Sequence, residues 1–146
     1  MHESFVEVSW EPEGDGTGRL SVVAVADDYS GLGSAWFDVD KVASFAQRLE
    51  AYPLPSIEAI ALTGGLAGQE LVGIRVAPVG VKGQIRVWVH LSTPQWEWPV
   101  TRPESVHDVR LEVLTTYGHL GRFASELGGA GWGKSLTARL NGEAMR

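Results

Sequence analysis

The sequence predicts an α+β two-layer sandwich, in which two helices cover one face of a mostly antiparallel sheet of about six to seven strands. Segments that alternate apolar and polar residues come in consecutive runs joined by short glycine-rich turns, as antiparallel strands do. Two other segments repeat apolar residues at helical spacing. The 146 residues suit a single domain, with its core over about residues 4–128 and a C-terminal tail over residues 129–146.

Three strands open the predicted order. Residues 6–10 alternate apolar and polar side chains, which is typical of a half-buried strand. Residues 19–27 are apolar on both faces, which favours a central strand. The glycine-containing stretch 29–33 predicts a turn into a third strand over residues 34–38. Asp38 is a good N-cap for the helix that follows, because its carboxylate can accept free amide hydrogens of the first turn.

Two helices are predicted in the rest of the chain. Apolar residues at helical spacing over 42–49 predict the first helix, which the prolines at 53 and 55 end. The second helix is expected over 117–127, ended by the glycines at 128–129. Between the helices, four strands are expected over residues 56–63, 70–78, 83–93 and 106–114. The tail after these elements is compatible with a short helix, an edge strand or a loosely held end.

Composition excludes several classes of protein. The chain has no cysteine, so disulfides, thiolate metal sites and cysteine nucleophiles are ruled out. It has 12 Lys and Arg against 18 Asp and Glu, which argues against a nucleic-acid partner. No segment reaches the ~20 apolar residues that cross a bilayer, and the start lacks a secretion signal. We therefore expect a soluble cytoplasmic protein with no membrane partner.

The charge is unevenly distributed along this acidic chain. Residues 1–73 hold 12 acids and 3 bases, whereas residues 74–146 hold 6 acids and 9 bases. The acidic half either aids solubility or attracts a basic partner.

One glycine-rich segment matches a phosphate-binding pattern. Residues 128–135 satisfy G-x-x-x-x-G-K-[ST], in which Lys134 would contact phosphates. That chemistry requires a strand before the loop and a helix after it, whereas here a predicted helix precedes the loop and only 11 residues follow it. The pattern is therefore interpreted as a helix terminator, and nucleotide hydrolysis is the weakest of the functional hypotheses.

The sequence offers no constellation for metal binding or catalysis. The candidate metal ligands are His90, His107, Asp108 and His119, without a recognised ligand spacing. No nucleophile elbow occurs, and His107 and Asp108 are strand neighbours that point to opposite faces. We therefore expect neither enzymatic activity nor a metal or other cofactor.

The most informative feature is one face of the later strands. If both helices cover one side of the sheet, the opposite side carries cationic, aromatic and acidic residues, namely Arg75, Arg86, Trp88, His90, Arg110 and Glu112. A loop with Trp96, Glu97, Trp98 and Arg102 leaves the same strand and could rim this face. Arginine and aromatic residues are typical anchors of protein interfaces, so the face either binds a partner or is covered by its own loop.

The order of elements resembles that of WapI-like immunity proteins of bacterial polymorphic toxin systems and their uncharacterised actinobacterial relatives. The resemblance rests on Ser34-Ala35-Trp36-Phe37-Asp38 running into the first helix, the strand Arg86-Val87-Trp88-Val89-His90-Leu91 and the helix from Tyr117 to Leu127. It implies a small cytoplasmic domain that binds and neutralises a toxin, with no catalytic residues. The Trp96–Pro103 loop and the tail after Gly128 have no counterpart in it.

These observations favour a non-enzymatic protein-binding module, plausible as an immunity protein that neutralises a cognate bacterial toxin. The alternative is a small-ligand or saccharide-binding domain, with Trp96 and Trp98 as stacking platforms. A homodimer is also possible, because an uncapped edge strand can pair across a two-fold axis.

Overall fold

The computed structural model describes residues 3–66, 68–80, 82–94, 102–128 and 133–143. Within these ranges the chain is α+β, with strands and helices in an order close to the predicted one. The elements are β1 (Phe5–Pro12), β2 (Thr17–Ala26), β3 (Tyr29–Asp38), α1 (Val39–Arg48), β4 (Ile60–Leu66), β5 (Gln69–Val79), β6 (Gln84–Ser92), the 3-10 helix η1 (Pro103–Ser105), β7 (Asp108–Thr116), α2 (Tyr117–Gly128) and β8 (Leu136–Asn141).

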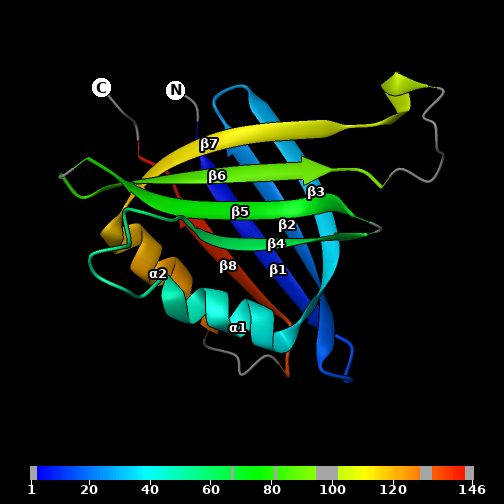
Figure 1. Cartoon of the computed structure of the whole chain (residues 1–146), viewed down its shortest axis with the longest axis horizontal. Helices are drawn as coiled ribbons and strands as arrows, with labels where there is room; N and C mark the ends of the chain where they lie inside the picture. The colour runs from blue at the N-terminus through cyan, green and yellow to red at the C-terminus, as the bar shows by residue number, and fades with distance from the viewer. Residues whose placement is uncertain (1–2, 67, 81, 95–101, 129–132, 144–146) are drawn as a thin grey trace.

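The strands form two antiparallel sheets, so the expectation of one sheet of six to seven strands is wrong. The first sheet has the order β3-β2-β1-β8, and the second has the order β4-β5-β6-β7 (Figure 1). Neighbours pair antiparallel throughout both sheets. Alternation along a sequence identifies a strand and its buried side, but it does not identify the partner strand. The break between the sheets falls at α1, which carries the chain from β3 to β4.

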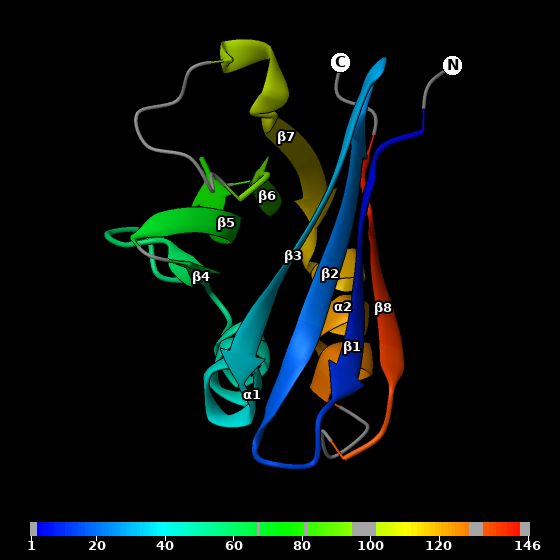
Figure 2. The ribbon, with the colours of Figure 1, turned by 90° about the vertical axis from the view of Figure 1, so that its right-hand side faces the viewer.

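The two sheets face one another, and both helices lie between them at one end of the molecule (Figure 2). Helix α1 buries Val42, Phe45 and Ala46, and α2 buries a similar apolar stripe that includes Leu120 and Phe123. Both stripes join one core with the inward side chains of both sheets. The helices therefore share a core with two sheets instead of covering one face of a single sheet.

At the other end, β3 packs closely against the second sheet. A Cβ atom added to Gly31 would lie 2.3 Å from Cγ1 of Val109, and one added to Gly33 would lie 3.1 Å from Leu91. Glycine is thus required in β3 because the sheets approach here, and residues 29–33 are not the predicted turn. The turn lies earlier, at Asp27, whose φ of 55° is left-handed.

The segment after residue 128 supplies a strand of the first sheet. Strand β8 pairs with β1, and Ala138 and Leu140 are fully buried in the shared core. Of the three conformations that the sequence left open, the edge strand is therefore the observed one. The predicted role of Asp38 differs as well: it occupies the N-cap position of α1, but its side chain makes no capping hydrogen bond.

The charged face of the second sheet

The predicted interface residues of β5, β6 and β7 lie together on the side of the second sheet that faces away from the core. Arg75 is opposite Trp88, which is opposite Glu112, and His90 is opposite Arg110. Their strand neighbours, such as Val87 and Val89, are buried on the inner side. We call this surface the charged face, which consists of Glu70, Arg75, Arg86, Trp88, His90, Asp108, Arg110 and Glu112.

The charged face is hollowed. A depression of about 750 Å³ is lined by seven of its residues, Asp108 being the exception, together with Ala59, Val89 and Leu111. Its walls combine charged side chains with the half-buried ring of Trp88. Such a mixture of apolar area and fixed charges suits recognition of a specific ligand or protein surface.

A β-bulge places Glu70 on the charged face. Between Gly64 and Gly65 of β4 the register with β5 shifts, so that Gly64 pairs with Val72 and Gly65 pairs with Glu70. Strand β5 thus carries one extra residue, Leu71, at this point. Without the bulge, Glu70 would share the inward orientation of Val72, which follows it by two residues, because side chains alternate along a regular strand. The Glu70 side chain instead meets Arg75 and His90.

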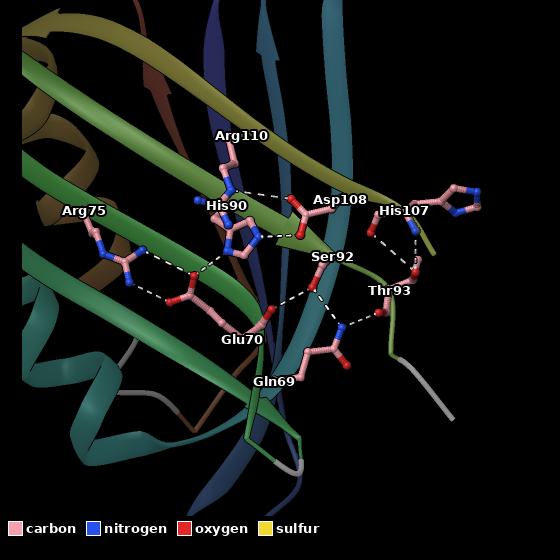
Figure 3. Close-up of polar contacts among 9 residues, drawn as sticks. All are labelled: Gln69, Glu70, Arg75, His90, Ser92, Thr93, His107, Asp108 and Arg110. Atoms are coloured by element: carbon pink, nitrogen blue, oxygen red, sulfur yellow. Dashed lines mark hydrogen bonds and ion pairs between the residues drawn. The ribbon is translucent and has the colours of Figure 1, made fainter. Parts of the chain in front are cut away.

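Glu70, His90 and Asp108 form a continuous chain of polar contacts across three strands (Figure 3). Nδ1 of His90 lies 2.5 Å from Oε2 of Glu70, and Nε2 lies 2.9 Å from Oδ2 of Asp108. Nη2 of Arg75 donates to Oε1 of Glu70 at 2.7 Å, and Nε of Arg110 lies 3.6 Å from Oδ1 of Asp108. Each carboxylate is therefore shared between the imidazole and one guanidinium.

This arrangement favours the charged forms of all three groups. Partial burial lowers the pKa of His90, but hydrogen bonds to Asp108 and Glu70 outweigh it, so the pKa of His90 is raised above 6.5. Partial burial raises the pKa of Glu70, yet the hydrogen bonds from Arg75 and His90 leave that pKa below its ordinary value of 4.5. The hydrogen bond from His90 is the main cause of the lowered pKa of Asp108. His90 thus tends to hold protons on both nitrogens.

Beside the Glu70–His90–Asp108 contacts, the charged face contains a second group of side chains that contact Trp88 or its neighbour Arg86. The guanidinium carbon of Arg86 lies 4.0 Å from the centroid of the Trp88 ring, which is a cation–π arrangement. Nε of Arg86 lies 2.5 Å from Oε2 of Glu112, as an ion pair without hydrogen-bond alignment. Both charged side chains are more than 40% exposed, so they are available to a partner while being held in place.

Polar contacts between β5 and β6 brace the bulged end of the site. Oγ of Ser92 donates to the carbonyl oxygen of Glu70 at 2.7 Å, and Nε2 of Gln69 donates to the carbonyl oxygen of Thr93 at 2.7 Å (Figure 3). Thr93 is itself joined to His107, whose N–H donates to the Thr93 hydroxyl at 2.9 Å. These contacts fix the backbone from which Glu70 and His90 project.

The sequence interpretation missed two members of the charged face and included four residues from the loop. Asp108 shares its strand face with Arg110 by simple alternation, so that signal was present in the sequence. Glu70 could not be found by alternation because the bulge reverses its orientation. Arg102 is exposed beside η1 and does not line the depression. Trp96, Glu97 and Trp98 lie outside the described residues.

The structure also locates the other motifs considered in the sequence, the candidate metal ligands and the phosphate-loop pattern. Among the described residues, no group of three or more His, Asp or Glu side chains is arranged to hold a metal ion. His119 contacts Glu143 and not His90, with Nε2 and Oε1 2.6 Å apart. Around the phosphate-loop pattern, α2 ends at Gly128 and β8 begins at Leu136. This helix-to-strand order is the reverse of a phosphate-binding loop.

Comparison with known proteins finds no relative of this chain. No protein-family model matches the chain, and no curated protein or solved structure is significantly similar to it. No helix in the described parts has both the length and the apolar character needed to cross a membrane.

Proposed function

We propose that this chain is a non-enzymatic protein-binding module whose charged face recognises a partner protein. The observation that carries this proposal is the stack of Arg86 on the half-buried Trp88 at the wall of a depression of about 750 Å³. Arginine and tryptophan contribute most binding energy when they lie near the centre of an interface. Ion pairs already hold several of these side chains, which lowers the entropy lost on binding.

The contacts of His90 favour binding over acid–base catalysis. A general base needs an imidazole nitrogen with a free lone pair, within reach of the substrate. Here Nδ1 faces Glu70 and Nε2 faces Asp108, and the raised pKa of His90 favours the doubly protonated ring. The imidazolium thus joins two carboxylates and orients them, together with Arg75 and Arg110.

The partner we propose is a bacterial toxin domain, which this chain would bind and neutralise in the cytoplasm. The resemblance of the sequence to WapI-like immunity proteins supports this choice. The charged face also fits it, because side chains of both signs are fixed there in one pattern, and such patterns discriminate between partners.

A co-expression experiment tests the proposal. If a toxin domain is encoded beside this gene, co-expression of the chain should protect host cells from it. The double variant Arg86→Ala with Trp88→Ala should bind that domain at least about 100-fold more weakly, because two such residues each contribute about 2 kcal/mol or more.

A matched arginine–aromatic pair provides the control. On the first sheet, the guanidinium carbon of Arg139 lies 3.8 Å from the centroid of the Phe5 ring. The double variant Phe5→Ala with Arg139→Ala should retain protection and affinity. Wild-type binding by Arg86→Ala with Trp88→Ala would exclude the charged face as the interface.

A further inference from the structure

Three of the four edge strands have backbone groups covered by other parts of the chain. On β4, Nζ of Lys41 donates to the carbonyl oxygen of Thr63. On β7, the N–H of Glu143 donates to the carbonyl oxygen of Leu114 at 2.7 Å. On β8, Oε1 of Glu126 accepts the N–H of Arg139 at 3.1 Å. Such contacts protect a sheet edge from pairing with another chain.

Strand β3 is the exception. It is the edge strand of the first sheet opposite β8, and its 10 residues make it the longest of the four edges. Among the described residues, no hydrogen bond from outside the sheet reaches its backbone. From Tyr29 to Phe37 it contains neither proline nor a charged residue, the usual features that blunt an edge. Alternate N–H and C=O groups of β3 therefore point away from β2.

The side chains of β3 provide apolar area beside these backbone groups. Leu32 is 71% exposed and Trp36 is 59% exposed, and both lie on the outer side of the first sheet. Leu32 is opposite the half-buried Val23 of β2, so the apolar area continues onto the next strand. An added strand would bury these side chains and pair the backbone at the same time.

The charges at the two ends of β3 indicate the kind of strand that fits. Asp27 and Asp28 precede it, and Asp38 and Asp40 end it or follow it, all four exposed. Two cations lie beside β3: Arg19, opposite Trp36 on β2, donates from Nη2 to Oγ of Ser34 at 3.1 Å, and Nζ of Lys41 lies 5.5 Å from the centroid of the Phe37 ring. The four carboxylates outnumber these two cations. Basic residues at both ends of an incoming strand would therefore meet opposite charges.

The same charges disfavour a second copy of this chain. Antiparallel pairing of two β3 strands would place the Asp27–Asp28 end of one copy against the Asp38 end of the other. A two-fold axis would produce this like-charge contact at both ends of the pair.

We propose that the edge of β3 docks an extended strand from a partner protein, with alternating apolar residues and with Lys or Arg at both ends. This strand adds to the first sheet beside β3, with Leu32 and Trp36 against its apolar side chains. The docking edge belongs to the first sheet, so it is separate from the charged face.

Amide hydrogen exchange of the full chain tests this inference with three peptides. The first peptide alternates valine and threonine and has two lysines at each end. The second has glutamates in place of the lysines, and the third has a central proline that interrupts pairing. We expect the lysine-ended peptide to slow exchange within residues 29–38 at least tenfold, the glutamate-ended peptide to do so several-fold less, and the proline peptide to have no effect.

Variants separate this edge from other surfaces. Leu32→Lys combined with Trp36→Lys should weaken binding of the lysine-ended peptide at least tenfold. Ile57→Lys is the matched control, because Ile57 is 100% exposed and lies outside β3. Arg86→Ala with Trp88→Ala should leave peptide binding unchanged, so failure of the charged face and failure of this edge are distinguishable.

Three outcomes would overturn the inference. The first is unchanged exchange of residues 29–38 at millimolar lysine-ended peptide. The second is equal protection by the lysine-ended and glutamate-ended peptides, which would remove the charge argument. The third is protection that rises with protein concentration in the absence of peptide, which would identify a second copy as the occupant.

Discussion

His90 is the residue on which the charged face depends, because its imidazole joins two carboxylates that lie on different strands. Removing its charge leaves Glu70 and Asp108 with one guanidinium each and without the bridge between them. Glu70 is only 25% exposed, so part of the lost interaction is not replaced by water. The stability of this region should therefore depend on pH through His90.

We predict that His90→Gln lowers the free energy of unfolding by about 1–2 kcal/mol near pH 6, as expected for partly exposed charged hydrogen bonds. Because folding raises the pKa of His90, its contribution is fully present below 6.5 and is lost as the pH rises through the raised value. Wild type and variant should therefore converge above that pKa. Urea denaturation from pH 5 to 9 measures the free energy of unfolding of both proteins. A difference between them that stays constant over this pH range would contradict the prediction.

The two carboxylates have the opposite dependence. Folding lowers the pKa of Glu70 and Asp108, so their contribution is present above 4.5 and 3.8, respectively, and is lost as the pH falls through the lowered values. When the pH is lowered into the acid range, Asp108→Asn should lose less stability than the wild type, because the variant lacks one of the two carboxylates. Its loss should still be detectable, since Glu70 keeps its partners. An acid transition unchanged by Asp108→Asn would show that the bond to His90 adds no stability.

At the scale of elements, the bulge where β4 and β5 pair decides which face Glu70 occupies. The register shift is possible because Gly65 has no side chain: an added Cβ atom would lie 1.7 Å from the carbonyl oxygen of Gln69. Backbone atoms cannot yield as the end of a flexible side chain can. Gly65 thus links the local geometry of one hairpin to the composition of the charged face.

We predict that Gly65→Ala destabilises the protein by about 2–3 kcal/mol through this clash and also lowers the raised pKa of His90. Gly121→Ala is the control, because an added Cβ meets nothing within 4 Å in helix α2, and it should stabilise by about 0.5–1 kcal/mol. Thermal unfolding reports stability and histidine NMR titration reports the pKa. A wild-type pKa in Gly65→Ala would show that the bulge does not position Glu70.

At the scale of the whole molecule, two segments that lie far apart in the sequence pair within one sheet. Strand β8 pairs with β1, and its buried Ala138 and Leu140 help cover α2 and the shared core. The first sheet therefore combines segments that precede the second sheet in the sequence with one that follows it. The second sheet, by contrast, consists of four consecutive strands, each paired with the next.

We predict that a chain ending at Ser135 loses cooperative unfolding, because it lacks β8 and exposes the edge of β1. Leu140→Ala tests the same strand in a chain that still folds, and should cost about 2–5 kcal/mol. The exposed Thr137→Ala on the same strand should change stability by less than about 0.5 kcal/mol. Urea unfolding followed by circular dichroism measures the stability of the truncated chain and of both variants. Cooperative unfolding of the truncated chain would contradict the role of β8.

Alternation and helical spacing were sufficient to predict most of the secondary structure. They predicted α1, α2 and the strands of the later half, along with the common orientation of Arg86, Trp88 and His90. These patterns are local, since a strand or helix that borders a core shows its buried side in its own residues. The same rule failed at the glycines of β3, because glycine is typical of both turns and close packing between sheets.

The sequence by itself determined the antiparallel α+β class and the outward orientation of the cationic and aromatic residues on β5, β6 and β7. The tertiary structure decided that the strands divide into two sheets, that β8 joins β1, and that Glu70 meets His90. Those outcomes depend on register and on contacts between distant segments, which alternation does not encode. A side chain's face is set by its neighbours in the chain, whereas its partners are set by the packing of the whole molecule.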